Sequence, residues 1–311
     1  MLLHVVHETR YDYSPAVKTA QHMAHLKPAH NERQQVLSHE LLVDPTPAQQ
    51  SEVVDVYGNT RAFFSLQVRH EELVIVATSL VSTSMPPLVQ CNMSWEEVRE
   101  RLRYHRGAAY DPAAEFVFAS PYVPRHEDFV AYALTSFTPN RNILEAARDL
   151  MHRIHVEFEY ETEATDVSTP ALEALELRKG VCQDFAHVML ACLRSLGLPA
   201  RYVSGYLLTE PPPGKPRLIG ADASHAWVSI YLPRLSADGE SSHGEWTDLD
   251  PTNDRAPGED YVTLAVGRDY ADVSPVRGVI HGGANHKLDV GVTVTPVDAS
   301  KRGAIAAPTI A

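Results

Sequence analysis

Cysteine, positive charge and long apolar runs are all scarce in this chain of 311 residues. Three cysteines cannot build a disulfide framework, and their odd count favours a reducing, cytoplasmic compartment. Nowhere do ~18 consecutive apolar residues occur, so we expect no membrane-spanning helix. The N-terminus also lacks the basic region of a signal peptide. Because 27 Lys and Arg face 40 Asp and Glu, the formal charge of -13 opposes binding to nucleic acid or to an anionic membrane.

Metal-binding motifs are missing as well. The sequence has no Cys-x-x-Cys, no His-Glu-x-x-His and no acidic loop with EF-hand spacing. We therefore expect neither a metal nor another cofactor. With 44% hydrophobic and 22% charged residues, the composition is that of an ordinary globular protein. The length suits about two domains.

Short runs rich in β-branched and aromatic residues fill the first part of the chain, and such runs are typical of strands. Gly58 lies between the fourth and fifth runs and can take the positive φ of a tight hairpin turn. One antiparallel β-domain is therefore predicted. The runs are residues 2–13, 19–26, 35–43, 51–57, 60–68 and 72–81.

Helix signals follow the strand-like runs. Ser94 and Glu97 have the spacing of a capping box, which predicts a helix over 95–105. Prolines and aromatic residues then favour a connector with a short helix around 128–134. We place the division between domains there, with an N-terminal β-domain over 1–125, a core over 126–299 and a flexible tail over 300–311.

Two Thr-Pro pairs mark further helix starts, at Thr138-Pro139 and at Thr169-Pro170. Gly180 is the predicted left-handed stop of the second of these helices.

The most informative segment comes next. Cys182 lies in the first turn of an apolar helix that is predicted to end at Gly197. Three strand-like runs follow, and after them irregular chain leads to a last strand over 288–297. A helix followed by an antiparallel sheet is the order of the thiol-protease type of α+β fold. The three runs are residues 200–208, 225–232 and 245–250.

Cys182 can act as a nucleophile only when its thiol ionises, and a free thiol has a pKa of ~8.5. A helix N-terminus lowers that pKa by about one unit at most, so a second cation is required. His225 can be that cation and can later protonate the leaving amine. Asp250, at the end of the next strand, could bind the imidazole Nδ1 and fix its tautomer. The free amide of Cys182 supplies one oxyanion donor, and the sequence identifies no second.

Each of these residues has an alternative reading. A lone Cys is more often a small buried apolar residue, and Cys192 fits that description. Among sixteen histidines, His187 lies five residues past Cys182 and faces elsewhere on the helix. Strand alternation puts Asp248 on the same face as Asp250. The residues alone therefore do not choose between these two aspartates.

Four motifs resemble the transglutaminase-like superfamily, in particular its bacterial branch with an N-terminal transglutaminase-associated β-domain. They are GVCQDFAH (180–187), SGYL (204–207), DASHAWV (222–228) and DPTN (250–253). The resemblance extends over nearly the whole chain. It implies a papain-like core in which Cys182, His225 and Asp250 correspond to the catalytic triad, and it favours Asp250 as the aspartate directly before Pro-Thr-Asn.

The family's chemistry implies attack of the thiolate on an amide to give a thioester acyl-enzyme. If water attacks the thioester, the protein is a cysteine peptidase or amidase. If a primary amine attacks it, the protein is a protein-glutamine γ-glutamyltransferase. We expect hydrolysis of a peptide or protein substrate, since water is present at ~55 M and amine transfer needs a shielded thioester. A non-catalytic binding module that retains the fold is the third reading.

Overall fold

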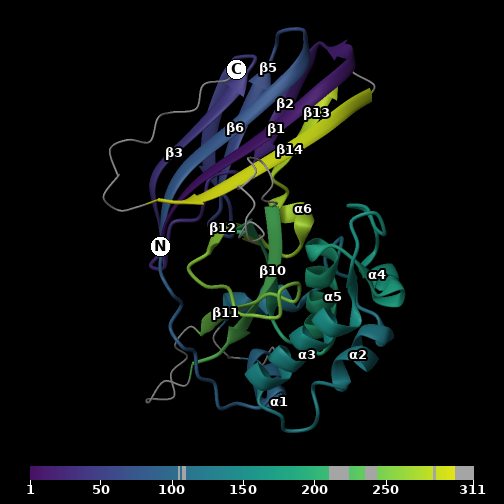
Figure 1. Cartoon of the computed structure of the whole chain (residues 1–311). Coiled ribbons are helices and arrows are strands. Elements are labelled where there is room, and N and C mark those ends of the chain that lie inside the picture. The colour runs from purple at the N-terminus through teal and green to yellow at the C-terminus, as the bar shows by residue number, and fades with distance from the viewer. Residues whose placement is uncertain (104–105, 107–109, 210–223, 235–243, 283–284, 298–311) are drawn as a thin grey trace, which may run out of the picture.

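The computed structural model describes residues 1–103, 106, 110–209, 224–234, 244–282 and 285–297. An N-terminal β-sandwich lies at one end and an α+β core at the other (Figure 1). The α+β class and the order of the two parts are confirmed. The predicted tail over 300–311 falls outside the described residues. None of the helices in the described ranges is long and apolar enough to cross a bilayer.

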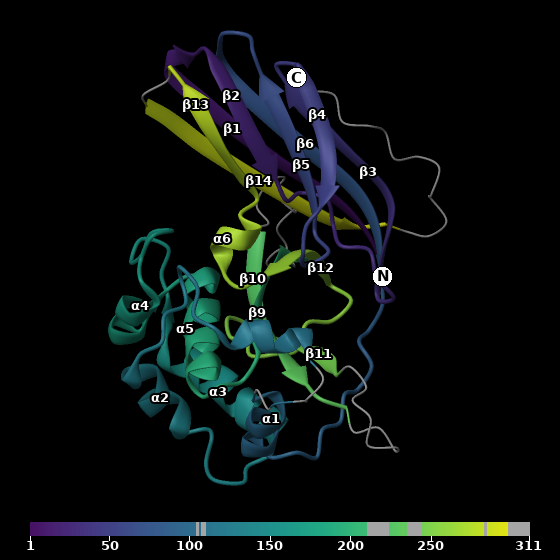
Figure 2. The same ribbon diagram turned by 180° about the vertical axis from the view of Figure 1, so that it is seen from behind.

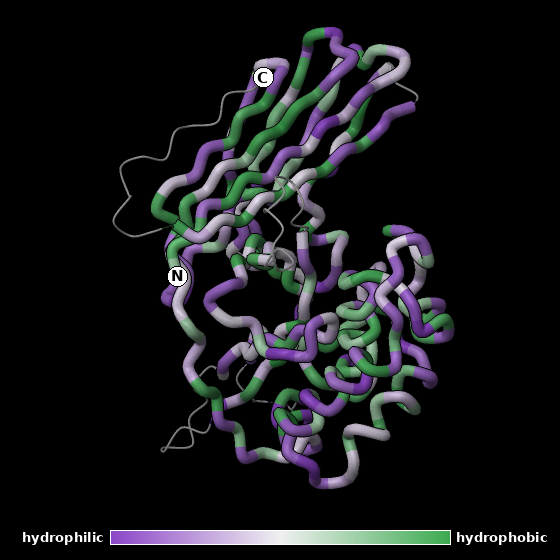
Figure 3. Tube along the Cα trace, in the orientation of Figure 1, coloured by the Kyte–Doolittle hydropathy of each residue, from purple (hydrophilic) through white to green (hydrophobic). Residues whose placement is uncertain are grey.

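Two four-stranded antiparallel sheets form the sandwich, in the orders β14-β1-β6-β3 and β13-β2-β5-β4. Apolar side chains such as Phe64, Leu73 and Ile75 are buried in its core. Figure 3 shows hydrophobic and hydrophilic residues alternating along these strands, as expected where one face of each sheet is buried. All six predicted N-terminal strands are present: β1 (Leu2–Val17), β2 (Thr19–Ala24), β3 (Gln34–Asp44), β4 (Gln49–Val54), β5 (Thr60–Leu66) and β6 (His70–Thr83).

The last two strands return to the sandwich. β14 (Asn285–Pro296) pairs with β1, and β13 (Val276–His281) pairs with β2. Both are drawn in yellow beside the purple first strands in Figures 1 and 2. The predicted division gave residues 276–296 to the core, whereas here they cover strands β1 and β2, which would otherwise be open sheet edges.

The core consists of helices packed against a second antiparallel sheet, in the order β11-β10-β9-β12. Its central helix, α5 (Cys182–Ser195), is buried along nearly its whole length and packs on β9 and β10. The sheet strands are β9 (Ala200–Leu207), β10 (Ser224–Leu232), β11 (Glu245–Leu249) and β12 (Tyr261–Gly267). The other elements are α1 (Trp95–Leu102), a 3₁₀ turn (Pro112–Val117), α2 (Glu127–Leu134), α3 (Ile143–Glu157), β7 (Glu159–Tyr160), α4 (Ala171–Leu177), β8 (Lys179–Gly180) and α6 (Tyr270–Val273).

Local capping explains where these helices begin. The capping box of Ser94 and Glu97 is formed at the start of α1, as predicted. The Thr138-Pro139 start is wrong: the side chain of Asn142 caps the amides of the first turn, so α3 begins at Ile143.

The end of α4 and the chain after residue 250 also differ from the predictions. Arg178, with φ of 54°, takes the left-handed position that was assigned to Gly180. The region expected to be irregular between Asp250 and residue 288 holds β12, α6 and β13. These elements are short, so their periodicity is too weak to identify them from the sequence.

Side-chain amides of the sandwich bind the outer edge of β12. The Gln34 amide donates to the Thr263 carbonyl at 2.7 Å and accepts from the Thr263 N–H at 2.7 Å. Asn59 makes the same pair of bonds with Val266, at 2.7 and 2.8 Å. Both amides are buried. They replace the hydrogen bonds of a missing neighbouring strand and thereby attach the core sheet to the sandwich.

Candidate active site

The site begins at the N-terminus of α5, where Cys182 is the first helical residue. The Asp184 carboxylate accepts hydrogen bonds from the Val181 N–H at 2.8 Å and the Thr165 hydroxyl at 2.7 Å. Gly180 has φ of 149°, and a Cβ there would overlap the Asp184 side chain. Glycine is therefore required for Asp184 to fold back over the turn that carries Cys182. The amide of Cys182 forms no hydrogen bond with the described residues, as expected at a first helical position.

His225 lies near the start of β10 and connects the other two predicted site residues. Its Nε2 lies 2.7 Å from Asp250 Oδ2, and the ring borders the same cleft as Cys182, which acts on the pKa of the ring. The expected contact of Asp250 with Nδ1 is therefore wrong. Asp250 approaches from the Nε2 side, which leaves Nδ1 as the ring nitrogen available to the thiol.

Asp250 is fully buried and is held entirely by donors. Its Oδ1 accepts from the backbone N–H groups of Thr252 and Asn253, at 2.9 and 3.2 Å. Its Oδ2 accepts, besides the His225 ring, the Asn253 side-chain amide and the Tyr261 hydroxyl, each at 2.7 Å. This set of donors requires an ionised carboxylate.

The structure also separates Asp250 from the aspartates near it. Asp248 has no hydrogen bond to His225 and instead lines a cavity at the domain junction. Asp254 accepts from the exposed ring of His152 at 2.7 Å. Of these three, only Asp250 contacts His225.

The electrostatics of the site favour an imidazolium. Burial lowers the pKa of His225, but the hydrogen bonds to Asp250 and Cys182, together with the charges of both, raise it to about 10. Burial raises the pKa of Asp250, but the hydrogen bond and charge of His225, with the donors Asn253 and Tyr261, lower it overall. The ring therefore lies between two groups that both stabilise its proton.

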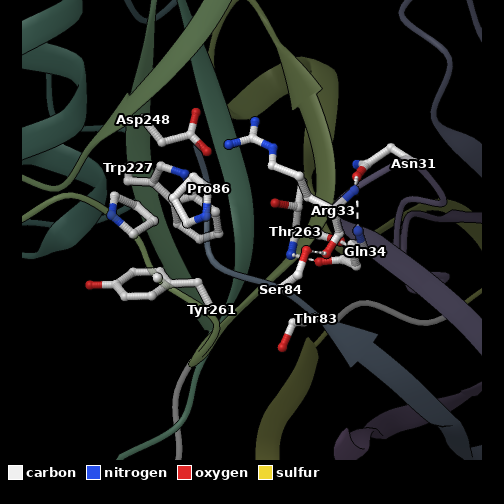
Figure 4. Close-up of a pocket in the computed structure, with 12 residues that line it drawn as sticks. Asn31, Arg33, Gln34, Thr83, Ser84, Pro86, Trp227, Asp248, Tyr261 and Thr263 are labelled. Carbon is white, nitrogen blue, oxygen red and sulfur yellow. Dashed lines mark hydrogen bonds between the residues drawn. The ribbon is translucent and has the colours of Figure 1, made fainter. Parts of the chain in front are cut away.

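Two aromatic rings cover the His225–Asp250 pair. Trp227 and Tyr261 lie with ring centroids 6.1 and 6.0 Å from the His225 ring and meet edge to face at 5.3 Å. Figure 4 shows both rings on one side of a small cavity, with Asn31 and other residues of the sandwich opposite. This polar cavity of about 50 Å³ lies behind the pair, and the aromatic rings separate the two.

A larger cleft opens in front of Cys182. It has a volume of about 300 Å³ and is bordered by Cys182 and His225 together with side chains from β9, α6 and the segment after β7. Two side chains of its border, Tyr160 and Val167, are 53% and 54% exposed. The cleft therefore reaches solvent. The segments on either side of β10 fall largely in 210–223 and 235–243, outside the described residues.

The remaining predictions concern residues away from the sulfur. Cys192 is fully buried in the core, as expected. His187 is buried and stacks between the rings of Tyr122 and Tyr202, away from His225. Within the described ranges, no group of three His, Cys, Asp or Glu side chains is arranged to hold a metal ion.

Sequence reasoning missed two contacts of Asp250. Asn253 lies in the DPTN motif, and its two donors could have been inferred from the position three residues after the aspartate. Tyr261 comes from β12, a strand that the sequence did not reveal, and no local signal marks it.

Two family models match this chain. The bacterial transglutaminase-like N-terminal region matches residues 3–82, and the transglutaminase-like superfamily matches residues 130–251. The first range coincides with the strands of the sandwich that precede the core. The second contains Cys182, His225 and Asp250.

Full-length relatives occur in mycobacteria. An uncharacterized protein of Mycobacterium tuberculosis is 41% identical over 302 residues, which cover 94% of this chain and 92% of the relative. An uncharacterized protein of Mycobacterium leprae is 33% identical over 301 residues, covering 94% and 98%. A protein-glutamine gamma-glutamyltransferase of Pseudomonas aeruginosa is 32% identical over 108 residues, which cover 32% of this chain and 15% of that protein.

A solved structure shares the whole fold. It belongs to a protein of Cytophaga hutchinsonii that is described as a candidate cysteine protease, with a TM-score of 0.68 and 21% sequence identity. The alignment covers 96% of this chain and 92% of that one, so both the sandwich and the core have counterparts there.

Proposed function

Because the chain belongs to the transglutaminase-like superfamily, we propose that it is a thiol-dependent acyl-transfer enzyme. In this proposal Cys182 is the nucleophile, His225 is its base and later the general acid, and Asp250 orients the ring. The observation that carries the proposal is the position of His225, which is hydrogen-bonded to the buried Asp250 carboxylate and borders the same cleft as Cys182. A thiol at a helix start beside an imidazolium is the arrangement that yields a reactive thiolate.

The proposed reaction has two stages. The thiolate adds to the carbonyl carbon of an amide, and the carbonyl electrons move to the oxygen. When this intermediate collapses, the C–N bond breaks, the amine takes the proton of His225, and a thioester remains on Cys182. An acceptor that loses its proton to His225 then attacks the thioester and restores the free thiol.

We favour water as the acceptor, which makes the protein a cysteine peptidase or amidase acting on a peptide or protein. Support comes from the half-exposed rim of the cleft at Tyr160 and Val167, through which water reaches the sulfur. Amine transfer requires the thioester to be shielded from ~55 M water. The three cysteines are all unpaired, which supports a reducing, cytoplasmic location.

Transfer to an amine is the second candidate, and the partial match to a protein-glutamine gamma-glutamyltransferase favours it. The two activities are separated by incubating the protein with a glutamine-containing peptide and a labelled alkylamine. Hydrolysis gives a cleaved peptide, or a deamidated peptide and ammonia, without the label, and transfer attaches the label to the peptide in place of ammonia.

The basic test of the proposal is chemical. We expect iodoacetamide to alkylate Cys182 near neutral pH much faster than it alkylates an ordinary thiol, and we expect Cys182→Ala to abolish turnover. Cys91 is the internal reference, since it is partly exposed and has no histidine partner among the described residues. Equal labelling of Cys91 and Cys182 would mean that the ion pair is absent and would favour a non-catalytic binding module. If Cys182 is the more reactive thiol, mass spectrometry of Cys182 after incubation with a cell extract would identify the acyl donor.

A further inference from the structure

Tyr202 extends from β9 into the cleft that contains Cys182. Its ring is fixed by aromatic neighbours, with the His187 ring centroid at 5.1 Å and the Tyr270 ring centroid at 6.5 Å. Only 2% of the residue is exposed. The phenol is therefore a rigid group inside the proposed site, and the reaction described above does not use it.

The Tyr202 hydroxyl forms no hydrogen bond with the described residues, although a buried tyrosine hydroxyl normally has a partner. Other tyrosines near the site do have one. The Tyr206 hydroxyl, on the same strand, lies 2.8 Å from His7 Nδ1, and the Tyr261 hydroxyl donates to Asp250. Tyr202 borders the cleft, so we expect its hydroxyl to donate a hydrogen bond to a molecule that occupies the cleft.

We propose that the Tyr202 hydroxyl is the second donor of the oxyanion hole, acting together with the backbone N–H of Cys182. This inference rests on the proposed thiol function. When the Cys182 sulfur bonds to the carbonyl carbon, the electron pair of the C=O bond moves to the oxygen. Tyr202 and the Cys182 amide each donate a hydrogen bond to that oxygen and keep their protons, and the pair returns when the leaving group departs.

The surroundings of Tyr202 keep it in the donor form. Burial raises the pKa of the phenol well above its usual value, and the nearby acidic groups of Cys182 and Asp184 raise it further. The hydroxyl therefore retains its proton throughout the range in which a thiolate enzyme works. Since the ring is already held by its neighbours, donating this bond costs little reorganisation.

The test compares two reactions of the same sulfur in Tyr202→Phe. Acylation of Cys182 by p-nitrophenyl acetate passes through a tetrahedral oxyanion, whereas alkylation by iodoacetamide displaces iodide and forms none. We expect Tyr202→Phe to slow acylation by about 10²-fold, the loss typical of one oxyanion donor, and to leave alkylation unchanged. Loss of this hydroxyl breaks no hydrogen bond within the described chain, so the fold should be kept.

Tyr132→Phe is the matched control. Tyr132 is also a buried tyrosine whose hydroxyl lacks a partner, but it lies on α2 away from the cleft. The Tyr132→Phe substitution should leave both the acylation and the alkylation of Cys182 unchanged. Unchanged acylation in Tyr202→Phe would overturn the inference, and so would an equal loss in both reactions, which would mean that Tyr202 acts on the thiolate instead. If Cys182 of the unmodified protein reacts with neither reagent faster than an ordinary thiol, the proposed function itself fails and the inference fails with it.

Discussion

Asp250→Asn changes the third member of the proposed triad without changing its size. Both oxygens of Asp250 face donors only: two backbone amides at Oδ1 and three side-chain groups at Oδ2. The amide of an asparagine must therefore turn its NH₂ group toward one of these two sets. In either orientation the asparagine N–H groups face other hydrogen-bond donors, so buried donors are left without acceptors. Each such unsatisfied group lowers the stability of the folded protein by about 1–3 kcal/mol.

The electrostatic loss is larger. An imidazolium and a carboxylate whose charge centres lie about 4 Å apart interact by about 4 kcal/mol at an effective dielectric constant near 20. No large discount for solvent applies, since the side chains of His225 and Asp250 are 10% and 0% exposed. Because 1.36 kcal/mol corresponds to one pKa unit, the pKa of His225 should fall by about 2–3 units in Asp250→Asn. Such a fall brings that pKa from about 10 to about 7–8, so the ring loses its positive charge, and the thiolate of Cys182 loses its counter-ion, as the pH rises through that range.

The rate of alkylation of Cys182 by iodoacetamide between pH 5 and 9 measures this effect. We expect Asp250→Asn to slow the reaction several-fold near pH 8, where the His225 ring of the variant has lost much of its charge and that of the unmodified protein, with a pKa of about 10, keeps it. Asp248→Asn is the control, because it removes a neighbouring charge that makes no hydrogen bond to His225. The reasoning is refuted if Asp250→Asn keeps the rate of the unmodified protein at pH 8, or if Asp248→Asn causes the same loss.

Three further predictions concern stability. Gly205→Ala should destabilise the core by about 1–3 kcal/mol in urea unfolding, because a Cβ would lie 2.5 Å from the Trp227 ring and closer still to the Val262 carbonyl. The sandwich should lose stability as the pH falls from about 6.5 toward 4. Burial lowers the pKa of His7 and His22 to about 4, so the unfolded state binds more protons in that window, and urea midpoints at pH 7 and pH 5 should reveal the difference. Deletion of residues 275–311 removes β13 and β14 and exposes the edges of β1 and β2, so limited proteolysis should then cut within the sandwich.

Each of these outcomes can fail independently. An unchanged urea midpoint in Gly205→Ala would mean that β10 and β12 shift to accommodate the methyl group. Equal midpoints at pH 7 and pH 5 would mean that the buried histidines take up protons in the folded state. A protease-resistant sandwich in the truncated chain would mean that the first six strands fold without their C-terminal partners.

Local signals in the sequence were sufficient for much of the site. The first-turn position of Cys182 follows from a helix pattern with defined ends, and the capping box of Ser94 and Glu97 forms as its spacing predicts. His225 and Asp250 were recognisable because each lies at the end of a strand-like run. Spacing alone left Asp248 and Asp250 equivalent, the family resemblance favoured Asp250, and the hydrogen bond between Asp250 and His225 agrees with that choice.

Long-range pairing was not predictable in the same way. The return of β13 and β14 to the sandwich depends on register with strands more than 250 residues earlier, as in the pairs Leu3↔Pro296 and Ala24↔Val276. The side of the His225 ring that faces Asp250 depends on the relative placement of β10 and β11. Tyr261 reaches Asp250 only because β12 lies beside β9, and the sequence before it gives no sign of that neighbour.

The sandwich is structurally connected to the site through β12. That strand is the edge of the core sheet, and Gln34 and Asn59 of the sandwich bind its outer backbone groups with both ends of their amides. The first residue of β12 is Tyr261, whose hydroxyl donates to Asp250. If the two amides were lost, the edge would exchange these bonds for water and Tyr261 would be held less firmly. The N-terminal part of the chain therefore supports the carboxylate that holds His225, which gives a physical reason for both parts to occur in one polypeptide.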